Sequence, residues 1–504
     1  MALSHAADVE RTAARTATGP ASAPAVPHYP MYIGGRWTDG SSTGRIEVEN
    51  PATEEIIGTV PAGTAADAEE ALRAAKVAQP AWAALPPIER ARFMHKLGAA
   101  ITRDQRRLAE VVVREQGKPL NQGLGEIDAV VMFLTYAAEN ARRIEGDILP
   151  SDKAGEEIWI RRVPFGVVVA LTAWNYPAAL AARKLGPALV AGNTIVLKAH
   201  EATPLSLVEI ARLCEEVGIP PGVVNVVSGE GRSVGEALVR SRLCDLVTMT
   251  GSVRAGKEIY RAGADQLKIL RLELGGKAPF IVMDDADIEA AAQAAVISRF
   301  TNCGQICTCN ERMYLHESIA DRFMASFLDK IGRMTVGDPM QDPDMGPKVS
   351  RIELEKVEAM VDKAVAGGAE LLAGGHRLSG GEYARGHWFQ PTVLGVADNS
   401  ASVMQNEIFG PVVPVMRVGS FDEALLLAND TSYGLSAYVY TRDLKRLMRL
   451  TAELDFGELY VNRPCGEMVQ GFHAGWKESG MGGEDGKYGF DNYLRKKTTY
   501  LNWT

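Results

Sequence analysis

The hydrophobic pattern of the chain changes character near Val163. Before that point, apolar residues return at steps of three and four through 65–83, 88–116 and 124–141, which predicts helices. After it, short apolar runs alternate with helical stretches. The runs are 166–173, 193–198, 223–227, 245–250 and 268–274, and the helical stretches are 178–191, 204–217, 231–241 and 253–263. This alternation predicts βαβ units and a parallel sheet covered on both faces, an architecture typical of nucleotide binding.

A second α/β series follows the first. It consists of a strand at 279–283, a helix at 287–300, a cysteine-containing loop, a strand at 312–316, a helix at 318–332 and further elements to about residue 462. Residues 141–163 and the last strand, KKTTYLNW, have few predicted strand neighbours in their own units. Such segments often pair across subunits. We also expect a short hairpin at MYIGGRW and a helix at 484–494.

Length and composition narrow the class of protein. A chain of 504 residues has room for two or three domains, and 46% hydrophobic with 23% charged residues is typical of a globular enzyme. The net charge of −9 argues against nucleic acid or an anionic membrane as the main partner, and no apolar run approaches the length of a membrane span. Six cysteines are too sparse for a disulfide framework, so we expect a cytoplasmic protein. We expect residues 1–28 to be a flexible tail rather than a targeting peptide, because their basic residues are balanced by acidic ones and they contain no apolar segment of the kind found in secretion signals.

Two segments carry candidate catalytic chemistry. The stretch FTNCGQICTCNER (300–312) supplies a candidate cysteine nucleophile, and LELGGK (272–277) supplies Glu273 between two leucines. A thiolate is a strong nucleophile near neutral pH, and burial would raise the proton affinity of the carboxylate. The cysteine cluster lacks zinc-finger spacing and a neighbouring His, so we expect no metal site. Together the two segments suggest covalent catalysis.

The signals for a dinucleotide are unusual. The turn after the first strand of the βαβ series, TAWNYP, has no Gly-rich loop, and Gly229-x-Gly231-x-x-x-Gly235 has one residue too many for the usual fingerprint. The segment GSVRAG (251–256) lies between a strand and a helix, where its N–H groups could face a phosphate; the alternative is a plain turn. Glu201 follows the second strand, where an acid that binds ribose belongs. Its charge disfavours a 2′-phosphate, so we expect NAD rather than NADP.

A series of motifs resembles the aldehyde dehydrogenase superfamily, from about residue 30 to the C-terminus. These motifs are WNYP (174–177), KAHEATP (198–204), MTGSVRAG (249–256), LELGGK (272–277), the Cys307 loop, EIFGP (407–411) and NDTSYGL (429–435). Within the superfamily, the chain is most similar to the lactaldehyde/glycolaldehyde dehydrogenase branch. That likeness rests on MTGSV, on the C-x-C-x-E-R end of the cysteine loop, and on QGFHAGWKESGMGGEDGKYG.

The resemblance implies an α/β fold with two domains built on parallel-rich sheets and a small β element for oligomerisation. It assigns 29–140 and 164–273 to a Rossmann-type NAD-binding domain, 274–482 to a catalytic domain, and 141–163 with 483–504 to the oligomerisation element of a homodimer or homotetramer. It also implies that Cys307 is the nucleophile, Glu273 the base and Asn175 an oxyanion donor. The implied cofactor-binding residues are Trp174, Lys198, Glu201, Gly229, Gly251, Ser252, Glu407 and Phe409.

The chemistry of these residue types fits the oxidation of an aldehyde to a carboxylate. Attack by Cys307 makes a tetrahedral thiohemiacetal, whose oxyanion expels hydride toward a nicotinamide. The amide of Asn175 would stabilise the oxyanion, and Glu273 would activate water to hydrolyse the thioester. Asn175 could instead cap the helix that begins near Pro177. A CoA-acylating relative would not need Glu273, and a cysteine hydrolase would need a His paired with Cys307, which is not evident nearby in the sequence.

The substrate is predicted from four residues. Arg183, on the helix after Asn175, favours a hydroxylated or anionic aldehyde through charge-assisted hydrogen bonds. By the resemblance, Thr308, Glu467 and His473 are further substrate-binding positions, and Glu467 and His473 could bind an α-hydroxyl; alternatively they form a loop salt bridge and a structural His. We therefore expect lactaldehyde or glycolaldehyde as substrate. Succinate semialdehyde is the alternative, since enzymes for it also carry Arg at the position of Arg183.

Overall fold

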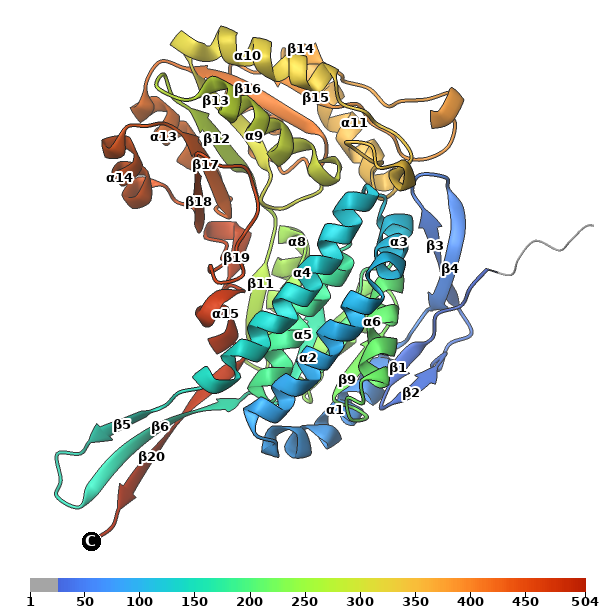
Figure 1. The fold of residues 1–504 in the computed structure, drawn as a ribbon, viewed down its shortest axis with the longest axis vertical. Coiled ribbons are helices and arrows are strands. Elements are labelled where there is room, and N and C mark those ends of the chain that lie inside the picture. Colours follow the sequence, from blue (N-terminus) through green and yellow to red (C-terminus); the bar gives the residue numbers. More distant parts are fainter. Residues whose placement is uncertain (1–25) are drawn as a thin grey trace, which may run out of the picture.

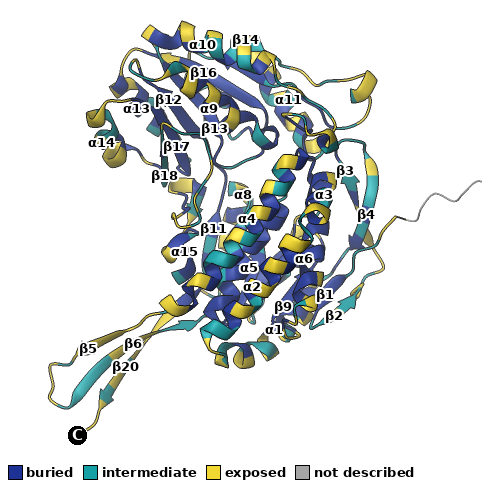
Figure 2. Ribbon diagram, in the orientation of Figure 1, coloured by how far each residue is buried: buried dark blue, intermediate teal, exposed yellow. Residues whose placement is uncertain are grey.

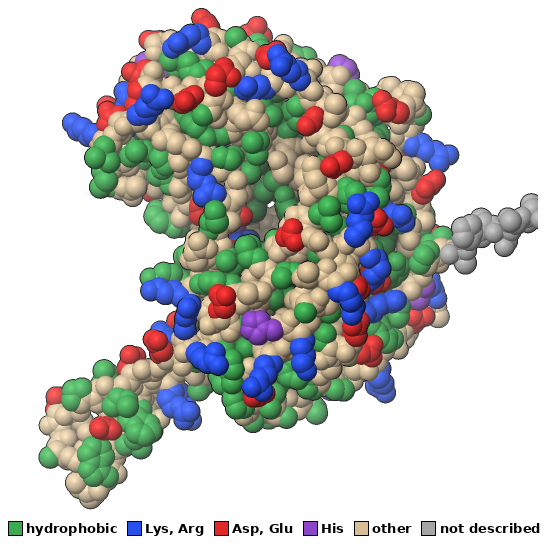
Figure 3. Space-filling view, in the orientation of Figure 1, with side chains coloured by type: hydrophobic (Ala, Val, Ile, Leu, Met, Phe, Trp, Pro, Cys, Tyr) green, Lys and Arg blue, Asp and Glu red, His purple; other side chains and the backbone are tan. Residues whose placement is uncertain are grey.

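The computed structural model describes residues 26–504, so most of the predicted tail 1–28 lies outside the described residues. His28 already belongs to the folded structure, because its ring bonds Thr59 at 2.9 Å and Asp39 at 2.7 Å. The remaining chain forms two α/β lobes and a projecting β element (Figure 1). In a space-filling view the surface is deeply notched between the two lobes (Figure 3).

The first lobe is built on an eight-stranded sheet with the order β19-β11-β10-β7-β8-β9-β1-β2. Its parallel centre confirms the five predicted strands: β7 (Val167–Leu171), β8 (Thr194–Lys198), β9 (Val224–Val227), β10 (Leu246–Thr250) and β11 (Ile269–Glu273). The predicted hairpin is β1 (Met31–Ile33) with β2 (Arg36–Thr38), and β19 (Gly480–Met481) closes the other edge. The carboxyl ends of β7, β8, β10 and β11 therefore meet at one edge of the sheet.

Helices cover both faces of this sheet. Val168 and Ala170 of β7 pack with one group of helices, and Val167 and Val169 pack with the other, as alternation along a strand requires. The first group is α2 (Pro87–Arg103), α3 (Gln105–Gln116), α4 (Leu120–Glu139), α5 (Pro177–Ala191) and α6 (Leu205–Glu216); the second is α1 (Ala65–Ala84), α7 (Glu236–Arg240) and α8 (Val253–Ala264). The single helix expected at 88–116 is two helices divided at Asp104, and a π-turn over 231–235 precedes α7. Among residues 26–504, no helix is both long and apolar enough to cross a membrane.

The second lobe is built on a seven-stranded sheet with the order β14-β15-β16-β13-β12-β17-β18. Its strands are β12 (Ala278–Val282), β13 (Asn310–His316), β14 (Glu370–Ala373), β15 (Thr392–Gly395), β16 (Val412–Val418), β17 (Ser436–Tyr440) and β18 (Glu458–Val461). One core contains side chains of α9 (Ile288–Phe300) and α10 (Glu317–Gly332). The other contains side chains of α11 (Arg351–Ala366), α12 (Ser402–Gln405), α13 (Phe421–Asn429) and α14 (Leu444–Glu453). The predicted second α/β series is confirmed.

The projecting element is a three-stranded sheet of β5 (Asp147–Pro150), β6 (Glu156–Pro164) and β20 (Leu494–Asn502). It lies away from both lobes, and much of its surface is exposed (Figures 1 and 2). Within the chain β20 pairs with β6, and Ile148, Tyr500 and Trp503 are each more than 60% exposed. The helix expected at 484–494 is confined to α15 (Gly486–Asp491). A separate hairpin, β3 (Arg45–Asn50) with β4 (Glu55–Pro61), packs on the first lobe.

Candidate active site

The loop that carries Cys307 lies between α9 and β13 and has unusual backbone geometry. Asn302 and Cys303 have φ values of 51° and 56°, a left-handed conformation that is uncommon for these residues. The buried Arg299 stabilises the loop by donating to the carbonyls of Gly304 at 2.7 Å and Asn310 at 2.8 Å. Cys307 is partly exposed at the bend, whereas Cys303 and Cys309 are buried. Of the three thiols on this loop, only that of Cys307 is therefore accessible from outside the protein core.

The two glycines of LELGGK allow three segments to meet. A Cβ on Gly276 would lie 2.2 Å from the carbonyl oxygen of Cys307, and a Cβ on Gly275 would lie 2.5 Å from the carboxylate of Glu407. Any side chain at these positions would push the segments apart. The glycines therefore bring the end of β11, with Glu273, against the Cys307 loop and Glu407.

Glu273 is a buried carboxylate without hydrogen bonds. It is 3% exposed, and neither of its carboxylate oxygens accepts a hydrogen bond from the protein. Burial raises the pKa of Glu273 to about 8, against the opposing charges of His473, Arg183 and Lys184. The ionised form of this group is therefore a stronger base than an ordinary carboxylate, and its fraction grows as the pH rises toward 8.

Asn175 lies in the turn after β7 and faces the cysteine loop. Its Nδ2 donates to the carbonyl of Gln305 at 3.0 Å, and its Oδ1 accepts no hydrogen bond from the first turn of α5. The capping role considered from the sequence is therefore wrong. Since a side-chain amide has two N–H groups, one remains to donate to an oxyanion on substrate attached to Cys307.

A buried ion pair that the sequence did not reveal holds the Asn175 turn. Lys118 and Glu126 form this pair, and their side chains are 0% exposed. Lys118 Nζ donates to the carbonyl of Asn175 at 2.8 Å, and Glu126 accepts the N–H groups of Ala178 and Ala179 at 2.9 and 3.2 Å. The pair thereby caps α5 and fixes the backbone that carries the amide.

A cavity of about 810 Å³ lies at the carboxyl ends of the parallel strands of the first sheet. Five of the predicted cofactor-binding residues line it: Trp174, Lys198, Glu201, Gly251 and Ser252. Lys198 pairs with Glu201 at 3.1 Å, and Ser252 caps α8 by accepting the N–H of Ala255. Gly229 does not line the cavity, but the next two residues, Glu230 and Gly231, do. Gly229 instead allows close packing, because a Cβ there would lie 2.4 Å from a methyl group of Val234.

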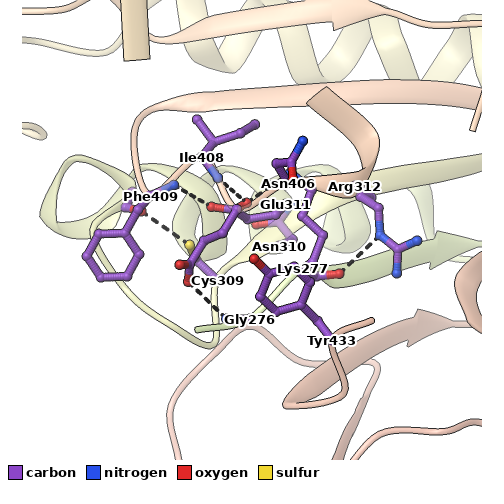
Figure 4. A network of polar contacts seen from close by, with 12 residues as sticks. Gly276, Lys277, Cys309, Asn310, Glu311, Arg312, Asn406, Ile408, Phe409 and Tyr433 are labelled. Carbon is purple, nitrogen blue, oxygen red and sulfur yellow. Dashed lines mark hydrogen bonds and ion pairs between the residues drawn. The ribbon is translucent and has the colours of Figure 1, made fainter. Parts of the chain in front are cut away.

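Ile408 and Phe409, the two residues after Glu407, lie on a loop that is held by Glu311 (Figure 4). The carboxylate of Glu311 accepts the N–H groups of Ile408 and Phe409, each at 2.7 Å, and pairs with Lys277 at 3.0 Å. Glu407 accepts the N–H of Gly276 at 2.9 Å, and burial together with the charge of Glu311 raises its pKa to about 7. The sequence analysis did not predict a role for Glu311, although Glu311 is the acidic residue of the C-x-C-x-E-R motif.

The aromatic ring of Phe409 packs against Trp174, with ring centroids 5.2 Å apart and planes perpendicular. Phe409 has φ of 55°, and its carbonyl accepts a hydrogen bond from Lys348. Trp174 also lines the cavity. The Phe409 loop of the second lobe thus adjoins the cavity of the first lobe through this aromatic pair.

Arg183 is buried and its charge is already paired. Its guanidinium bonds the carboxylate of Asp485 through two nitrogens and lies 3.6 Å from Glu484. Its side chain is 9% exposed. Two carboxylates therefore neutralise the cation that the sequence offered as an anchor for an anionic substrate.

The other three predicted substrate-binding residues lie near the two catalytic candidates, Cys307 and Glu273. Thr308 follows Cys307 in the chain and is buried, and Glu467 lies 3.9 Å from Nδ1 of His473. The imidazole of His473 lies 3.6 Å from the carboxylate of Glu273 and 3.1 Å from that of Glu458. β19 and the loop before it fold back onto β11, which brings His473 next to Glu273 although the two residues are 200 positions apart in the sequence.

Comparison with known proteins agrees with this arrangement. Residues 37–499 match the sequence profile of the aldehyde dehydrogenase family. The chain therefore belongs to the aldehyde dehydrogenase family, and it is an oxidoreductase that acts on aldehydes with NAD or NADP. The fold expected from the motif series is confirmed.

Two characterised relatives show where in the family the chain lies. It is 51% identical to the 3,6-anhydro-alpha-L-galactose dehydrogenase of a Vibrio species (strain EJY3), over 94% of this chain and 99% of that protein. It is 42% identical to the lactaldehyde dehydrogenase of Escherichia coli (strain K12), over 94% of this chain and 98% of that protein. A solved structure of 3,6-anhydro-L-galactose dehydrogenase in complex with NADP superposes with a TM-score of 0.93 at 50% identity, covering 94% of this chain and 100% of that one. The resemblance to the lactaldehyde dehydrogenase branch is confirmed.

Proposed function

We propose that this enzyme oxidises a small hydroxylated aldehyde to its carboxylate, with Cys307 as nucleophile. The observation that carries the proposal is the cluster of Glu467 and His473 next to Glu273, with His473 lying 3.9 Å from Glu467 and 3.6 Å from Glu273, together with Thr308 next to Cys307 in the chain. These side chains can donate to and accept from a hydroxyl group next to the reacting carbonyl. The names of the two relatives support the same class, since lactaldehyde and anhydrogalactose are both hydroxylated aldehydes.

The catalytic residues act in a defined order. Cys307 attacks the carbonyl carbon, and the amide of Asn175 donates to the oxygen that gains negative charge. When bound, NAD(P) accepts the hydride. Glu273 then takes a proton from water, which attacks the thioester and releases the carboxylate. Burial of Glu273 supports this last role, because it raises the pKa of the carboxyl to about 8.

The residues around the cavity fit a dinucleotide. The cavity has a volume of about 810 Å³ and lies at the N-terminus of α8, where free backbone N–H groups suit a pyrophosphate. The carboxylate of Glu201, in the cavity wall, suits the hydroxyl groups of a ribose. We infer a preference for NAD, because Glu201 would repel a 2′-phosphate. Glu407 and Phe409 would contact the nicotinamide half, since their loop adjoins Trp174.

Assembly and location complete the proposal. The exposed Ile148, Tyr500 and Trp503 on the projecting sheet support its role as the oligomerisation element of a homodimer or homotetramer. The boundaries 29–140 with 164–273, and 274–482, remain our proposal for the NAD-binding and catalytic domains. The six free cysteines favour a reducing compartment, and we propose the cytoplasm.

A substrate panel tests the proposal. NADH formation would be measured with lactaldehyde, glycolaldehyde, 3,6-anhydrogalactose and succinate semialdehyde, for the wild type and for Cys307→Ala. We expect higher kcat/KM for the hydroxylated aldehydes and no turnover by the variant. The pairing of Arg183 with Asp485 disfavours the succinate semialdehyde alternative. A clear preference for succinate semialdehyde would contradict the proposed substrate class, and activity in the variant would contradict the nucleophile.

A further inference from the structure

The segment of Asp485 is joined to the loop 467–473, which carries two of the predicted substrate-binding residues. Glu484 exchanges two backbone hydrogen bonds with His473, of 2.9 and 2.7 Å, and the N–H of Gly486 donates to a carbonyl of the loop at 2.8 Å. Asp485 lies between these two contacts, and its side chain is 5% exposed. The buried carboxylate of Asp485 is therefore fixed next to this loop.

Asp485 has an unfavourable backbone conformation and an unusual side-chain contact. Its φ of 61° and ψ of 170° lie in a region that suits glycine. It stands at the N-cap of α15, but its carboxylate does not cap that helix. Instead the carboxylate accepts hydrogen bonds from Nε of Arg183, at 3.0 Å, and from Nη2. The chain therefore tolerates strain at a position whose side chain contacts α5.

Arg183 and Asp485 belong to a buried cluster of four charges. Lys184 pairs with Glu484, and Arg183 lies 3.6 Å from the same carboxylate. All four side chains are at most 9% exposed. The two cations balance the two carboxylates. A further carboxylate at this cluster would add an unbalanced negative charge, which is unfavourable where burial excludes water.

The guanidinium of Arg183 keeps one group for a ligand. Its hydrogen bonds with residues 26–504 use Nε and Nη2, which leaves the two N–H groups of Nη1. Arg183 also lines a cavity of about 20 Å³, whose wall includes Asp485 and Val469 of the loop 467–473. A hydroxyl group that accepts from Nη1 leaves the four charges balanced. A carboxylate must instead compete with Asp485 for the guanidinium.

We propose that Asp485 sets the substrate class of this enzyme by binding the charge of Arg183. With Asp485 in place, the site accepts an uncharged hydroxylated aldehyde and rejects an aldehyde that carries a carboxylate. Asp485 acts through Arg183, so it is a positioning residue that determines specificity. This inference rests on the proposed function, which places the substrate at Cys307 and the loop 467–473.

Asp485→Asn tests this assignment, because the amide keeps the shape of the side chain and removes its charge. NADH formation would be measured with lactaldehyde and with succinate semialdehyde, which gives kcat and KM for each. We expect kcat/KM for succinate semialdehyde relative to lactaldehyde to rise by about tenfold or more, mainly through a lower KM for succinate semialdehyde. Asp128→Asn, the same charge change at an exposed position of α4, is the matched control and should keep the wild-type ratio.

The double variant that combines Arg183→Met with Asp485→Asn shows whether Asp485 acts through Arg183. It should lose the gain for succinate semialdehyde, since no guanidinium remains to bind the carboxylate. Asp485→Gly keeps the test decisive if Asp485→Asn does not fold, because glycine suits the φ of 61° and also lacks the carboxylate. We expect a rise of the same size in Asp485→Gly.

Two results would overturn the inference. One is a wild-type ratio in the folded single variants of Asp485, and the other is a rise that persists without Arg183. Preference of the wild type for succinate semialdehyde, or turnover by Cys307→Ala, would instead overturn the proposed function. The two failures are therefore distinct.

Discussion

Replacing Glu273 with Gln removes one proton-binding group and keeps the shape of the side chain. In the folded protein burial raises the pKa of this carboxyl from 4.5 to about 8. Between these two pH values the folded protein holds a proton that the unfolded chain has lost. The stabilisation that comes from protonated Glu273 is thus fully present below pH 4.5 and is lost as the pH rises through about 8. At about 1.4 kcal/mol per unit, the interval corresponds to at most about 5 kcal/mol.

The variant should lose this dependence, because an amide is neutral at every pH in the range. Melting temperatures of wild type and Glu273→Gln would be compared at pH 5 and pH 9. We expect the variant to gain stability relative to the wild type as the pH rises. Glu139→Gln, an exposed carboxylate on α4, is the control and should follow the wild type.

The same variant has a catalytic signature. Without a base for water, steady-state turnover should fall by about 10²–10⁴, while one equivalent of NADH still forms in a rapid burst as the thioester accumulates. Full steady-state turnover in Glu273→Gln would refute its assignment as the base. Parallel melting curves at both pH values would refute the raised pKa.

Three further results are expected. Asn175→Ala should lower kcat by about 10²–10³ with NAD binding retained, and unchanged kcat would exclude it as the oxyanion donor. Glu201→Gln should improve the affinity for NADP relative to NAD about fivefold in fluorescence titrations, because a repulsion of ~1 kcal/mol is removed. An unchanged ratio would place the ribose elsewhere. Lys118→Met leaves Glu126 buried without its partner and should lower the free energy of unfolding by about 3–5 kcal/mol. The double variant with Glu126→Gln should recover much of that loss. Equal melting temperatures for wild type and Lys118→Met would refute the structural role of the pair.

The strands and the order of motifs were readable from the chain, because each depends on local sequence. Apolar runs bounded by turns place β7 to β11 within about two residues, since a strand buried on both faces must be apolar throughout. The sequence did not reveal the break at Asp104 inside the predicted helix 88–116, because the spacing of apolar residues does not change there. Cys307 and Glu273 could be proposed as catalytic residues because each lies in a short motif that the sequence shows directly.

Contacts between distant parts of the chain depended on the folded topology. Periodicity does not indicate that the segment before β19 returns to β11, and this return places His473 3.6 Å from Glu273. The same holds for Asp485, which neutralises Arg183, and for Lys118, which fixes the turn of Asn175. A charged residue looks the same in a sequence whether it faces solvent or a buried partner, and only the packing of segments distinguishes the two. The amino-acid order thus specified the chemical groups of this aldehyde dehydrogenase, and the fold specified which groups act on one another.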